Sequence, residues 1–433
     1  MTEDLRRYTL TLTEAAEAIA ERRLTAVELA TAQLARVRAT DAAVEAWVTL
    51  DADRTLREAS HWDASPHGGS LGGIGVGVKD IIATADLPTT MGSPLFADHR
   101  PALDAACIAR LKAAGAFVFG KTVTTPFAFM DPGKTRNPWD PAHTPGGSSS
   151  GSAAAVAVGQ VTAAIGTQTN GSVVRPAAYC GVIGFKPTLG AIPFAGVHLF
   201  SETHDTVGTF TRTVEDAARI ASVLADPGRI SGALVPLSST PRFAYIGDFP
   251  WTALDCDADD VVEGAVTILR TRAEVTPVDV PAAWHGARDL HRTIMLYEAV
   301  RNMGGLQERE RARLTPAVNA ALDEGRTISK RAYEAALSER ERAIAFFTRR
   351  LEEFDAVLSP SAPGPAPRGL ATTGDPSCCT LWSLLGFPAI SIPAGFVGRM
   401  PVGLQLAAPQ SCDDRLLAVA AWCGARLPFR GLV

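Results

Sequence analysis

The sequence of 433 residues has no long hydrophobic run, no C-x-x-C pair and no marked excess of either charge. No window approaches about 18 consecutive apolar residues, the length that a membrane-spanning helix needs. The N-terminus also lacks the uninterrupted apolar segment of a signal peptide. We therefore expect a cytoplasmic protein without a membrane partner.

The cysteines are scattered along the chain, and their number, seven, is odd. A disulfide framework would need an even set in an oxidising compartment, and a zinc site would need closely spaced cysteine or histidine pairs. The pattern instead predicts free thiols in a reducing compartment, with neither a disulfide framework nor a zinc site.

The balance of basic and acidic residues argues against a nucleic-acid partner. The chain has 41 basic and 46 acidic residues, which gives a formal net charge of −5. A nucleic-acid-binding surface requires a clustered basic surplus, whereas the basic residues near 338–350 are interleaved with glutamates. We therefore expect no nucleic-acid partner. The hydrophobic content of 46% is ordinary for a globular protein with a large core.

Strand and helix patterns alternate through the middle third of the chain. The stretch "GGIGVGVKDII" (72–82) has the two-residue period of a strand, and a helical segment precedes the apolar strand "AFVFGKT" (116–122). This alternation predicts the α/β class, with a mixed, twisted β-sheet sandwiched by helices. We expect one domain over residues 1–433. Its expected parts are a helical N-terminal arm, a core, a mostly helical lobe and a return to the core (1–65, 70–235, 240–350 and 355–433).

Two local features concern helix ends. Thr11 or Thr13 is placed to cap the first helix, with glutamate following. The small-residue run at 151–172 follows three serines and is predicted to be a helix packed tightly inside the core, capped by Ser152. The serine loop before it is therefore expected to be rigid rather than a linker between domains.

Two short patterns match known sites but fail their structural requirements. "GAFVFGKT" (115–122) matches the phosphate-binding loop, but its variable positions are apolar and no helix begins after it. "GSSSG" (147–151) matches the nucleophile elbow with Ser149 as nucleophile, but turn-forming residues precede it instead of a strand. An elbow also needs a histidine, and the nearest candidates, His198 and His204, are expected to have surface or core roles.

A serine nucleophile needs a group that accepts its proton. Without a convincing histidine, the alternative is a lysine kept neutral by burial, and Lys79 ends an apolar strand with small residues on its own face. Its position alone also suits a solvent-exposed charge. Ser172 follows a turn in which Asn170 and Gly171 tolerate positive φ, so that backbone N–H groups could converge into an oxyanion hole. The turn alone would also suit an ordinary hairpin.

Several longer motifs occur in a fixed order from about residue 70 to 410. They are "GVKD", "TRNPWDPAHTPGGSSSGSAAAVA", "GTQTNGS", "RPAAYCGVIGFKPT", "GFPAISIP" and "PVGLQLAAP". On these motifs the sequence resembles the amidase signature hydrolases over nearly its whole length. The resemblance implies the amidase signature fold and hydrolysis of an amide, or of a carbamate or ester, without metal or organic cofactor.

The resemblance also implies a Ser–cis-Ser–Lys triad. Matched positions make Ser172 the nucleophile, Lys79 the base and Ser148 the serine that bridges them. A cis peptide bond is expected between Gly147 and Ser148. The oxyanion hole is expected from the backbone N–H groups of the nucleophile loop (Thr169, Asn170, Gly171 and Ser172).

The segment around Ser172 departs from the common family pattern. Gln168 replaces an acid, Asn170 replaces a glycine, and Arg175 lies three residues after Ser172 rather than two. The same shift is similar to the malonamidase-like subgroup, in which this arginine binds a substrate carboxylate. Arg175 is therefore a candidate anchor for an anionic substrate or a member of a structural salt bridge. The side chain of Asn170 would occupy space that a glycine leaves open.

The stretch "FAFMDPGKT" resembles the pocket-lining segment of the family. Phe127, Phe129 and Met130 are therefore candidate substrate contacts that suit an aryl or apolar amide, although an apolar run before a turn also suits a core. The choice between an anionic and an apolar amide stays open, as does a homodimer. A second interpretation is the amidase-like subunit of a tRNA-dependent amidotransferase, against which the substituted "GTQTNGS" segment and a slightly short chain argue.

Overall fold

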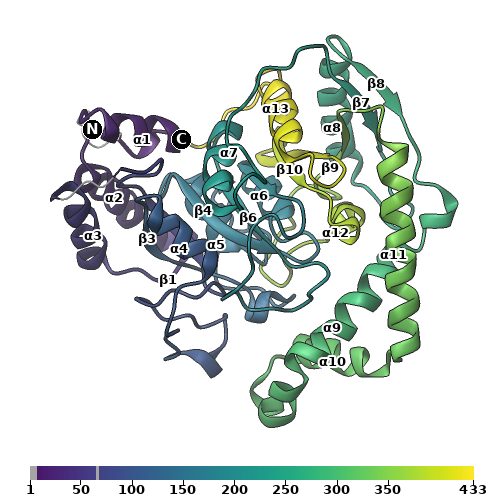
Figure 1. Ribbon diagram of the computed structural model, residues 1–433, viewed down its shortest axis with the longest axis horizontal. Helices are drawn as coiled ribbons and strands as arrows, with labels where there is room; N and C mark the ends of the chain where they lie inside the picture. The colour runs from purple at the N-terminus through teal and green to yellow at the C-terminus, as the bar shows by residue number, and fades with distance from the viewer. Residues whose placement is uncertain (1–6, 65–67) are drawn as a thin grey trace.

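Eleven strands form one continuous mixed sheet, flanked by helices, in the computed structural model, which describes residues 7–64 and 68–433 (Figure 1). The strand order is β1-β3-β2-β4-β6-β5-β10-β11-β9-β7-β8. The strands are β1 (Trp47–Thr49), β2 (Gly75–Lys79), β3 (Phe117–Thr122), β4 (Ala163–Gln168), β5 (Ile183–Lys186), β6 (Thr206–Thr211), β7 (Arg242–Tyr245), β8 (Glu274–Pro277), β9 (Ala356–Pro360), β10 (Ala389–Val397) and β11 (Met400–Ala407).

The helices follow from the same alternation of patterns and confirm the predicted α/β class. They are α1 (Leu12–Ala20), α2 (Ala26–Val44), α3 (Ala52–Ala64), α4 (Ala106–Ala113), α5 (Ser150–Ala157), α6 (Val174–Cys180), α7 (Val214–Leu224), α8 (Cys256–Arg270), α9 (Ala287–Glu310), α10 (Pro316–Thr327), α11 (Lys330–Arg350), α12 (Thr380–Leu385) and α13 (Asp413–Gly424).

The core lies on both faces of the sheet because successive side chains of a strand point to opposite sides. On β4, Ala163 and Ile165 join a hydrophobic cluster that includes α7. Ala164, between them, joins a second cluster that includes α5. The small residues of α5 are all buried, so this helix packs closely against the strands.

The first helix begins at one of the two threonines that the sequence offers as caps. Thr11 rather than Thr13 caps α1, and its hydroxyl accepts the N–H of Glu14 while the Glu14 carboxylate accepts the N–H of Thr11. The first turn of α1 is also held by Asp216 of α7, which accepts two backbone N–H groups. This pairing fastens the arm to a helix of the core.

The predicted helix over 151–172 is wrong in extent. Helix α5 ends at Ala157, and Gly159 follows with φ of +73°, a conformation that terminates helices. The chain then forms β4. Ser152 is not the cap, because it lies inside α5, where its hydroxyl donates to the Ile165 carbonyl at 3.0 Å.

The segment 240–350 is mostly helical, as expected, but it also contains β7 and β8, which extend the same sheet at one edge. These strands are short and contain exposed polar residues, so their sequence carries little strand signal. Helices α9, α10 and α11 lie together at the right of Figure 1. Two of them, α9 and α11, contact α12.

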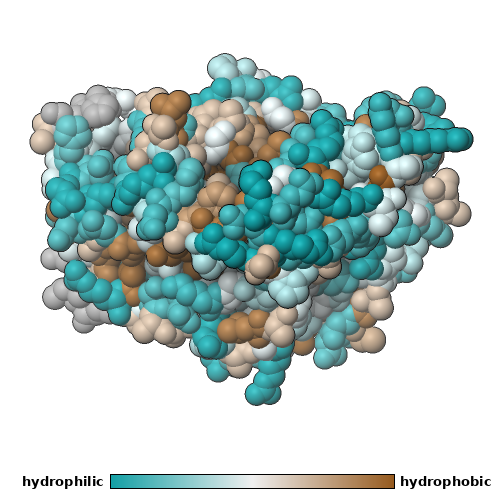
Figure 2. Space-filling model, turned by 90° about the horizontal axis from the view of Figure 1, so that it is seen from below, coloured by the Kyte–Doolittle hydropathy of each residue, from teal (hydrophilic) through white to brown (hydrophobic). Residues whose placement is uncertain are grey.

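Within the stretch 115–122, residues 117–122 form the buried strand β3 and no helix begins directly after it, as the sequence predicts. All seven cysteines are free thiols, as predicted. Within the described residues, none of the helices combines the length and apolar character needed to span a membrane. Seen from below, hydrophilic residues cover most of the surface, and hydrophobic residues form several separate areas (Figure 2).

Candidate active site

The candidate site lies where two parallel strands end side by side. Strands β2 and β4 pair in parallel, with Val78 beside Ile165, so the carboxyl ends of both strands reach the same edge. Lys79 is the last residue of β2, and Gln168 is the last residue of β4. Ligands of α/β proteins commonly bind at such carboxyl ends.

The Lys79 side chain is fully buried, which contradicts the solvent-exposed alternative. Its Nζ atom lies 2.7 Å from Ser148 Oγ and 2.8 Å from Thr167 Oγ1. Burial lowers the pKa of Lys79 well below its ordinary value, and the negative charge of Asp205 opposes this shift only in part. Burial therefore makes the neutral amine of Lys79 more accessible than it is in water.

The serine loop is buried and makes several hydrogen bonds. The peptide bond between Gly147 and Ser148 is cis, at the expected position. Arg175 donates a hydrogen bond to the Gly147 carbonyl at 2.7 Å. Ser149 is fully buried, and its hydroxyl bonds the Thr167 carbonyl at 3.1 Å. Ser149 is thus absent from the cavity lining, which argues against the nucleophile-elbow interpretation.

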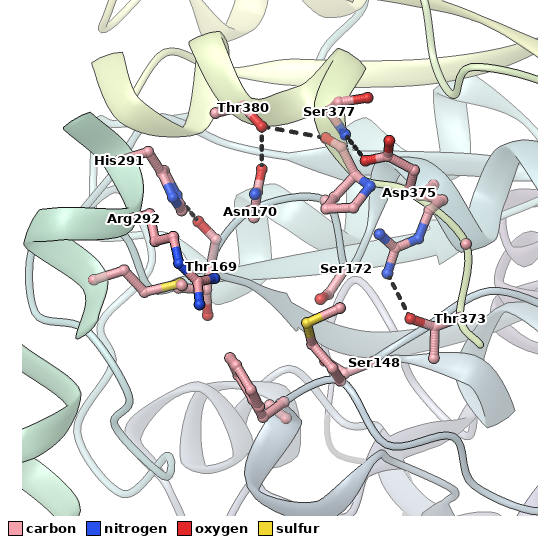
Figure 3. Close-up of a pocket in the computed structure, with 18 of the residues that line it drawn as sticks. Ser148, Thr169, Asn170, Ser172, His291, Arg292, Thr373, Asp375, Ser377 and Thr380 are labelled. Atoms are coloured by element: carbon pink, nitrogen blue, oxygen red, sulfur yellow. Dashed lines mark hydrogen bonds between the residues drawn. The ribbon is translucent and has the colours of Figure 1, made fainter. Parts of the chain in front are cut away.

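Ser172 and Ser148 both line a cavity of about 460 Å³, large enough for a small organic ligand. Figure 3 shows both side chains extending toward this cavity. Ser172 is half-buried and Ser148 is buried. Ser148 therefore connects the buried Lys79 amine to the cavity that Ser172 borders.

The loop at 169–172 reaches its shape differently from the prediction. Neither Asn170 nor Gly171 has a positive φ, so that expectation is wrong. Gly171 is instead required by a close approach, because a Cβ there would lie 2.9 Å from the Cβ of Pro376. Thr380 donates to the Asn170 side-chain oxygen at 3.0 Å, which holds that side chain toward α12 (Figure 3).

Gln168, which stands where the family commonly has an acid, has a structural contact of its own. Its side-chain oxygen accepts the backbone N–H groups of Val173 and Val174 at 2.8 and 3.0 Å. These groups open α6, whose first N–H groups have no partner within the helix. Gln168 thereby joins the end of β4 to the helix that follows Ser172.

The predicted substrate contacts divide into two groups. Phe129, Met130 and Arg175 line the cavity, but Phe127 does not. Phe127 is only 1% exposed and packs against Phe96 and His198, with ring centroids 6.0 and 5.5 Å away. Phe127 is therefore a core residue, whereas Phe129, two residues later, lines the cavity.

Arg175 forms no ion pair in the part of the chain that the structure describes. Besides the Gly147 carbonyl, its guanidinium donates to Thr373 Oγ1 at 3.1 Å, and its Nε atom is buried without a partner. The predicted structural salt bridge is therefore absent among the described residues, and the guanidinium of Arg175 borders the cavity, where Asp375 is close enough to act on its charge without forming an ion pair.

His204 is buried and His198 is half-buried, and both stay outside the cavity lining, in keeping with a core role. Burial, with Lys79 nearby, lowers the pKa of His198 to about 4. Burial also holds the pKa of His204 well below its ordinary value. Both rings are therefore neutral at physiological pH. Among the described residues, no group of three or more His, Cys, Asp or Glu side chains is arranged to hold a metal ion.

Sequence reasoning missed several residues that complete the site. Asp205 accepts the Thr169 hydroxyl at 2.5 Å and the N–H of Phe200 at 2.7 Å, and burial raises its pKa to about 6. His291 of α9 lies 3.1 Å from the Thr169 carbonyl and lines the cavity. These residues have no recognisable motif, because only the fold brings their distant segments to the loop.

Comparison with known proteins assigns the chain to a family. The family model described as Amidase matches residues 28–417. This chain belongs to the amidase family. A curated relative from Roseiflexus sp., a glutamyl-tRNA(Gln) amidotransferase subunit, is 34% identical, and the alignment covers 95% of both chains.

Solved structures of amidases share the whole fold. One, described as a crystal structure of amidase, has a TM-score of 0.87 and 30% identity, covering 97% of this chain and 100% of the other. The peptide amidase of Stenotrophomonas maltophilia has a TM-score of 0.84 and 26% identity, covering 99% of both chains. The amidase signature fold is therefore confirmed. The finer resemblance to malonamidases stays a prediction.

Proposed function

We propose that this amidase-family protein hydrolyses a carboxamide C–N bond through an acyl-enzyme on Ser172. Neutral Lys79 takes a proton from Ser148 as Ser148 takes one from Ser172, and the freed Ser172 oxygen attacks the substrate carbonyl carbon. The backbone N–H groups of residues 169–172 hold the oxyanion that results.

The second half of the reaction returns the proton. Lys79 passes it through Ser148 to the leaving nitrogen, the C–N bond breaks, and ammonia or an amine departs. Water then attacks the acyl-enzyme in the same way, with the same relay removing its proton, and releases the carboxylic acid and free Ser172. No metal or organic cofactor takes part in these steps. Carbamates and esters present the same carbonyl and are further candidate substrates.

One observation carries this proposal: a fully buried lysine lies 2.7 Å from a serine that lines the cavity. A charged ammonium is costly to bury, so burial favours the neutral amine that can act as a base. No acidic side chain pairs with Lys79 at contact distance in the described part of the chain, and its close partners are hydroxyls and a carbonyl. A purely structural lysine would more commonly be paired with a carboxylate, as Lys121 is with Asp80 at 3.4 Å.

The charge of the cavity wall favours a substrate with an acidic group. Arg175, Arg288 and Arg292 line the cavity, whereas Asp375 is the acidic residue in the lining. Arg292 is already neutralised by Glu324, whose oxygens lie 2.6 and 2.5 Å away. Arg175 and Arg288 together still outweigh the single negative charge of Asp375, which suits the carboxylate anchor implied by the malonamidase-like pattern. Phe129 and Met130 add apolar surface for the rest of the substrate.

A second candidate function is that of an amidotransferase component. It is favoured by the 34% identity to the glutamyl-tRNA(Gln) amidotransferase protein of Roseiflexus sp.. The chain covers 95% of that relative, so the chain length does not argue against this role. With this function the expectation of no nucleic-acid partner would be wrong. Copurification of a partner subunit, with amidase activity that depends on tRNA and ATP, would support it over the first candidate.

The decisive experiment is covalent labelling with a fluorophosphonate. We expect one label per chain, and we expect Ser172→Ala to abolish it. Ser149→Ala is the matched control, because Ser149 is buried outside the cavity lining, and it should keep the label. Labelling that survives in Ser172→Ala but disappears in Ser149→Ala would refute the assignment. A hydrolysis screen over malonamate, short aliphatic amides, anilides and aryl carbamates would then identify the substrate.

A further inference from the structure

The backbone of the nucleophile loop is held by side chains from two distant helices. His291 of α9 lies with its Nε2 atom 3.1 Å from the Thr169 carbonyl (Figure 3). A carbonyl oxygen can only accept, so Nε2 carries the proton. Ser383 of α12 donates its hydroxyl to the next carbonyl, that of Asn170. The third carbonyl, of Gly171, accepts the N–H of Arg175 at 3.0 Å in the first turn of α6.

Holding a carbonyl also fixes the following N–H. The C=O of one residue and the N–H of the next belong to one planar peptide unit and point in opposite directions. The His291 bond therefore sets the direction of the Asn170 N–H, and the Ser383 bond sets that of the Gly171 N–H. In the described residues, neither of these N–H groups donates to a protein acceptor. They are free to bind a substrate oxygen.

We propose that His291 and Ser383 are positioning residues that orient the Asn170 and Gly171 N–H groups as oxyanion donors. The proposal rests on the proposed function and deepens it, because it makes α9 and α12 part of the catalytic apparatus. Preorganised donors lower the barrier because they need no reorientation as charge develops on the carbonyl oxygen. The two side chains act through the loop rather than through the nucleophile.

The ring of His291 is held in place by its buried neighbours. The His291 ring is 1% exposed and lies against His204, with ring centroids 4.2 Å apart. His204 in turn bonds Ser201 at 2.8 Å, and Ser201 donates to the buried carboxylate of Glu298 at 2.5 Å. Burial lowers the pKa of His291 to about 4, so the ring is neutral at physiological pH. Such a fixed, neutral ring is suited to hold one hydrogen bond in a constant geometry.

The variants His291→Phe and His291→Gln test the hydrogen bond that His291 Nε2 donates to the Thr169 carbonyl. Phenylalanine keeps a ring but has no N–H, whereas the amide nitrogen of glutamine reproduces the Nε2 position. We expect His291→Phe to lower kcat by about 10- to 100-fold, less than the loss of a whole oxyanion donor, because the peptide N–H is misaimed rather than removed. KM should change by much less. His291→Gln should restore kcat to within a few-fold of the native value.

Ser383→Ala tests the second bond with a small change in volume. It should lower kcat by about 10-fold. In both His291→Phe and Ser383→Ala the rate of fluorophosphonate labelling should fall in parallel with kcat, since phosphonylation uses the same donors. The matched controls remove similar bonds elsewhere. His285→Phe removes a histidine contact to the Val280 carbonyl at 3.1 Å, and Ser391→Ala removes a buried hydroxyl pair with Ser361 at 2.9 Å. Both controls should keep native kcat.

Three results would overturn the proposal. They are native kcat in His291→Phe and Ser383→Ala, an equal loss in His291→Gln and His291→Phe, or a loss that only follows the folded fraction measured by thermal unfolding. If His291→Phe does not fold, His291→Asn is measured instead. The amide of asparagine reaches the Nδ1 position rather than Nε2, so this variant should also have a lower kcat. Ser172→Ala is labelled alongside. If it keeps the label, the proposed function fails, independently of the His291 result.

Discussion

Gly171→Ala is expected to impair catalysis more than folding, because the added methyl group would meet atoms that cannot turn away. The new Cβ would lie 2.9 Å from Pro376 Cβ, 3.2 Å from Cys379 Sγ and 3.3 Å from Cys379 Cβ. Proline is a closed ring, so its Cβ cannot rotate out of the contact. The strain must be relieved by moving the loop or the segment at 375–379.

The contact distances give the size of the effect. Carbon atoms prefer separations of about 3.5–4.0 Å, so the loop and Pro376 must separate by about 0.6 Å or more. Overpacking of this kind costs about 1–3 kcal/mol of the free energy of unfolding. A misplacement of about 1 Å lowers rates by roughly 10²-fold, so we expect kcat to fall by about 10- to 100-fold.

The assay compares kcat, the fluorophosphonate labelling rate and the thermal midpoint of Gly171→Ala with those of Gly264→Ala. Gly264 lies exposed within α8, and a Cβ there would have no heavy atom within 4 Å. Alanine at that position should leave kcat unchanged and stabilise the helix by about 0.5–1 kcal/mol. Native kcat and native stability in Gly171→Ala would refute the packing argument for this loop.

Two further predictions concern charge. Activity should be lost as pH falls and Lys79 becomes protonated, and Asp205→Asn should shift this acid limb of kcat/KM to lower pH, because the Asp205 carboxylate raises the pKa of Lys79. An unchanged or upward-shifted limb in a pH profile would contradict this reasoning. Arg175→Met should lower kcat/KM for amides that carry a carboxylate about 10-fold more than for neutral amides of the same size, because it removes a charged hydrogen bond. Equal losses for both substrates would mean that Arg175 serves only to hold the Gly147 carbonyl.

The sequence alone predicted features that depend on neighbouring residues. The alternation in "GGIGVGVKDII" predicted β2, and the apolar run before Lys121 predicted a buried strand instead of a phosphate loop. A threonine at 11 or 13 with glutamate following predicted the start of α1, and the structure selects Thr11. Motif order allowed Lys79, Ser148 and Ser172 to be named as one site, although their spacing would not single them out without the family resemblance.

Errors arose where packing overrides local preference. The run at 151–172 has helical composition throughout, yet its second half pairs as β4 between β2 and β6 and becomes a strand. Asn170 and Gly171 tolerate positive φ but do not use it, because the loop is shaped by contacts with α12 and Pro376. Phe127 and Phe129 are alike in sequence, and only the turn between them sends one into the core.

What the sequence by itself determined is the set of candidate groups for the proposed chemistry: a lysine and two serines, which the structure places around one cavity. Only the tertiary structure decided how that chemistry is supported. His291 and Ser383 lie 122 and 213 residues from the carbonyls that they hold. Asp205, which shapes the charge around Lys79, is likewise brought close by the fold. Hydrophobic periodicity reports the preference of each segment for helix or strand, but contacts over such separations depend on which segments pack together.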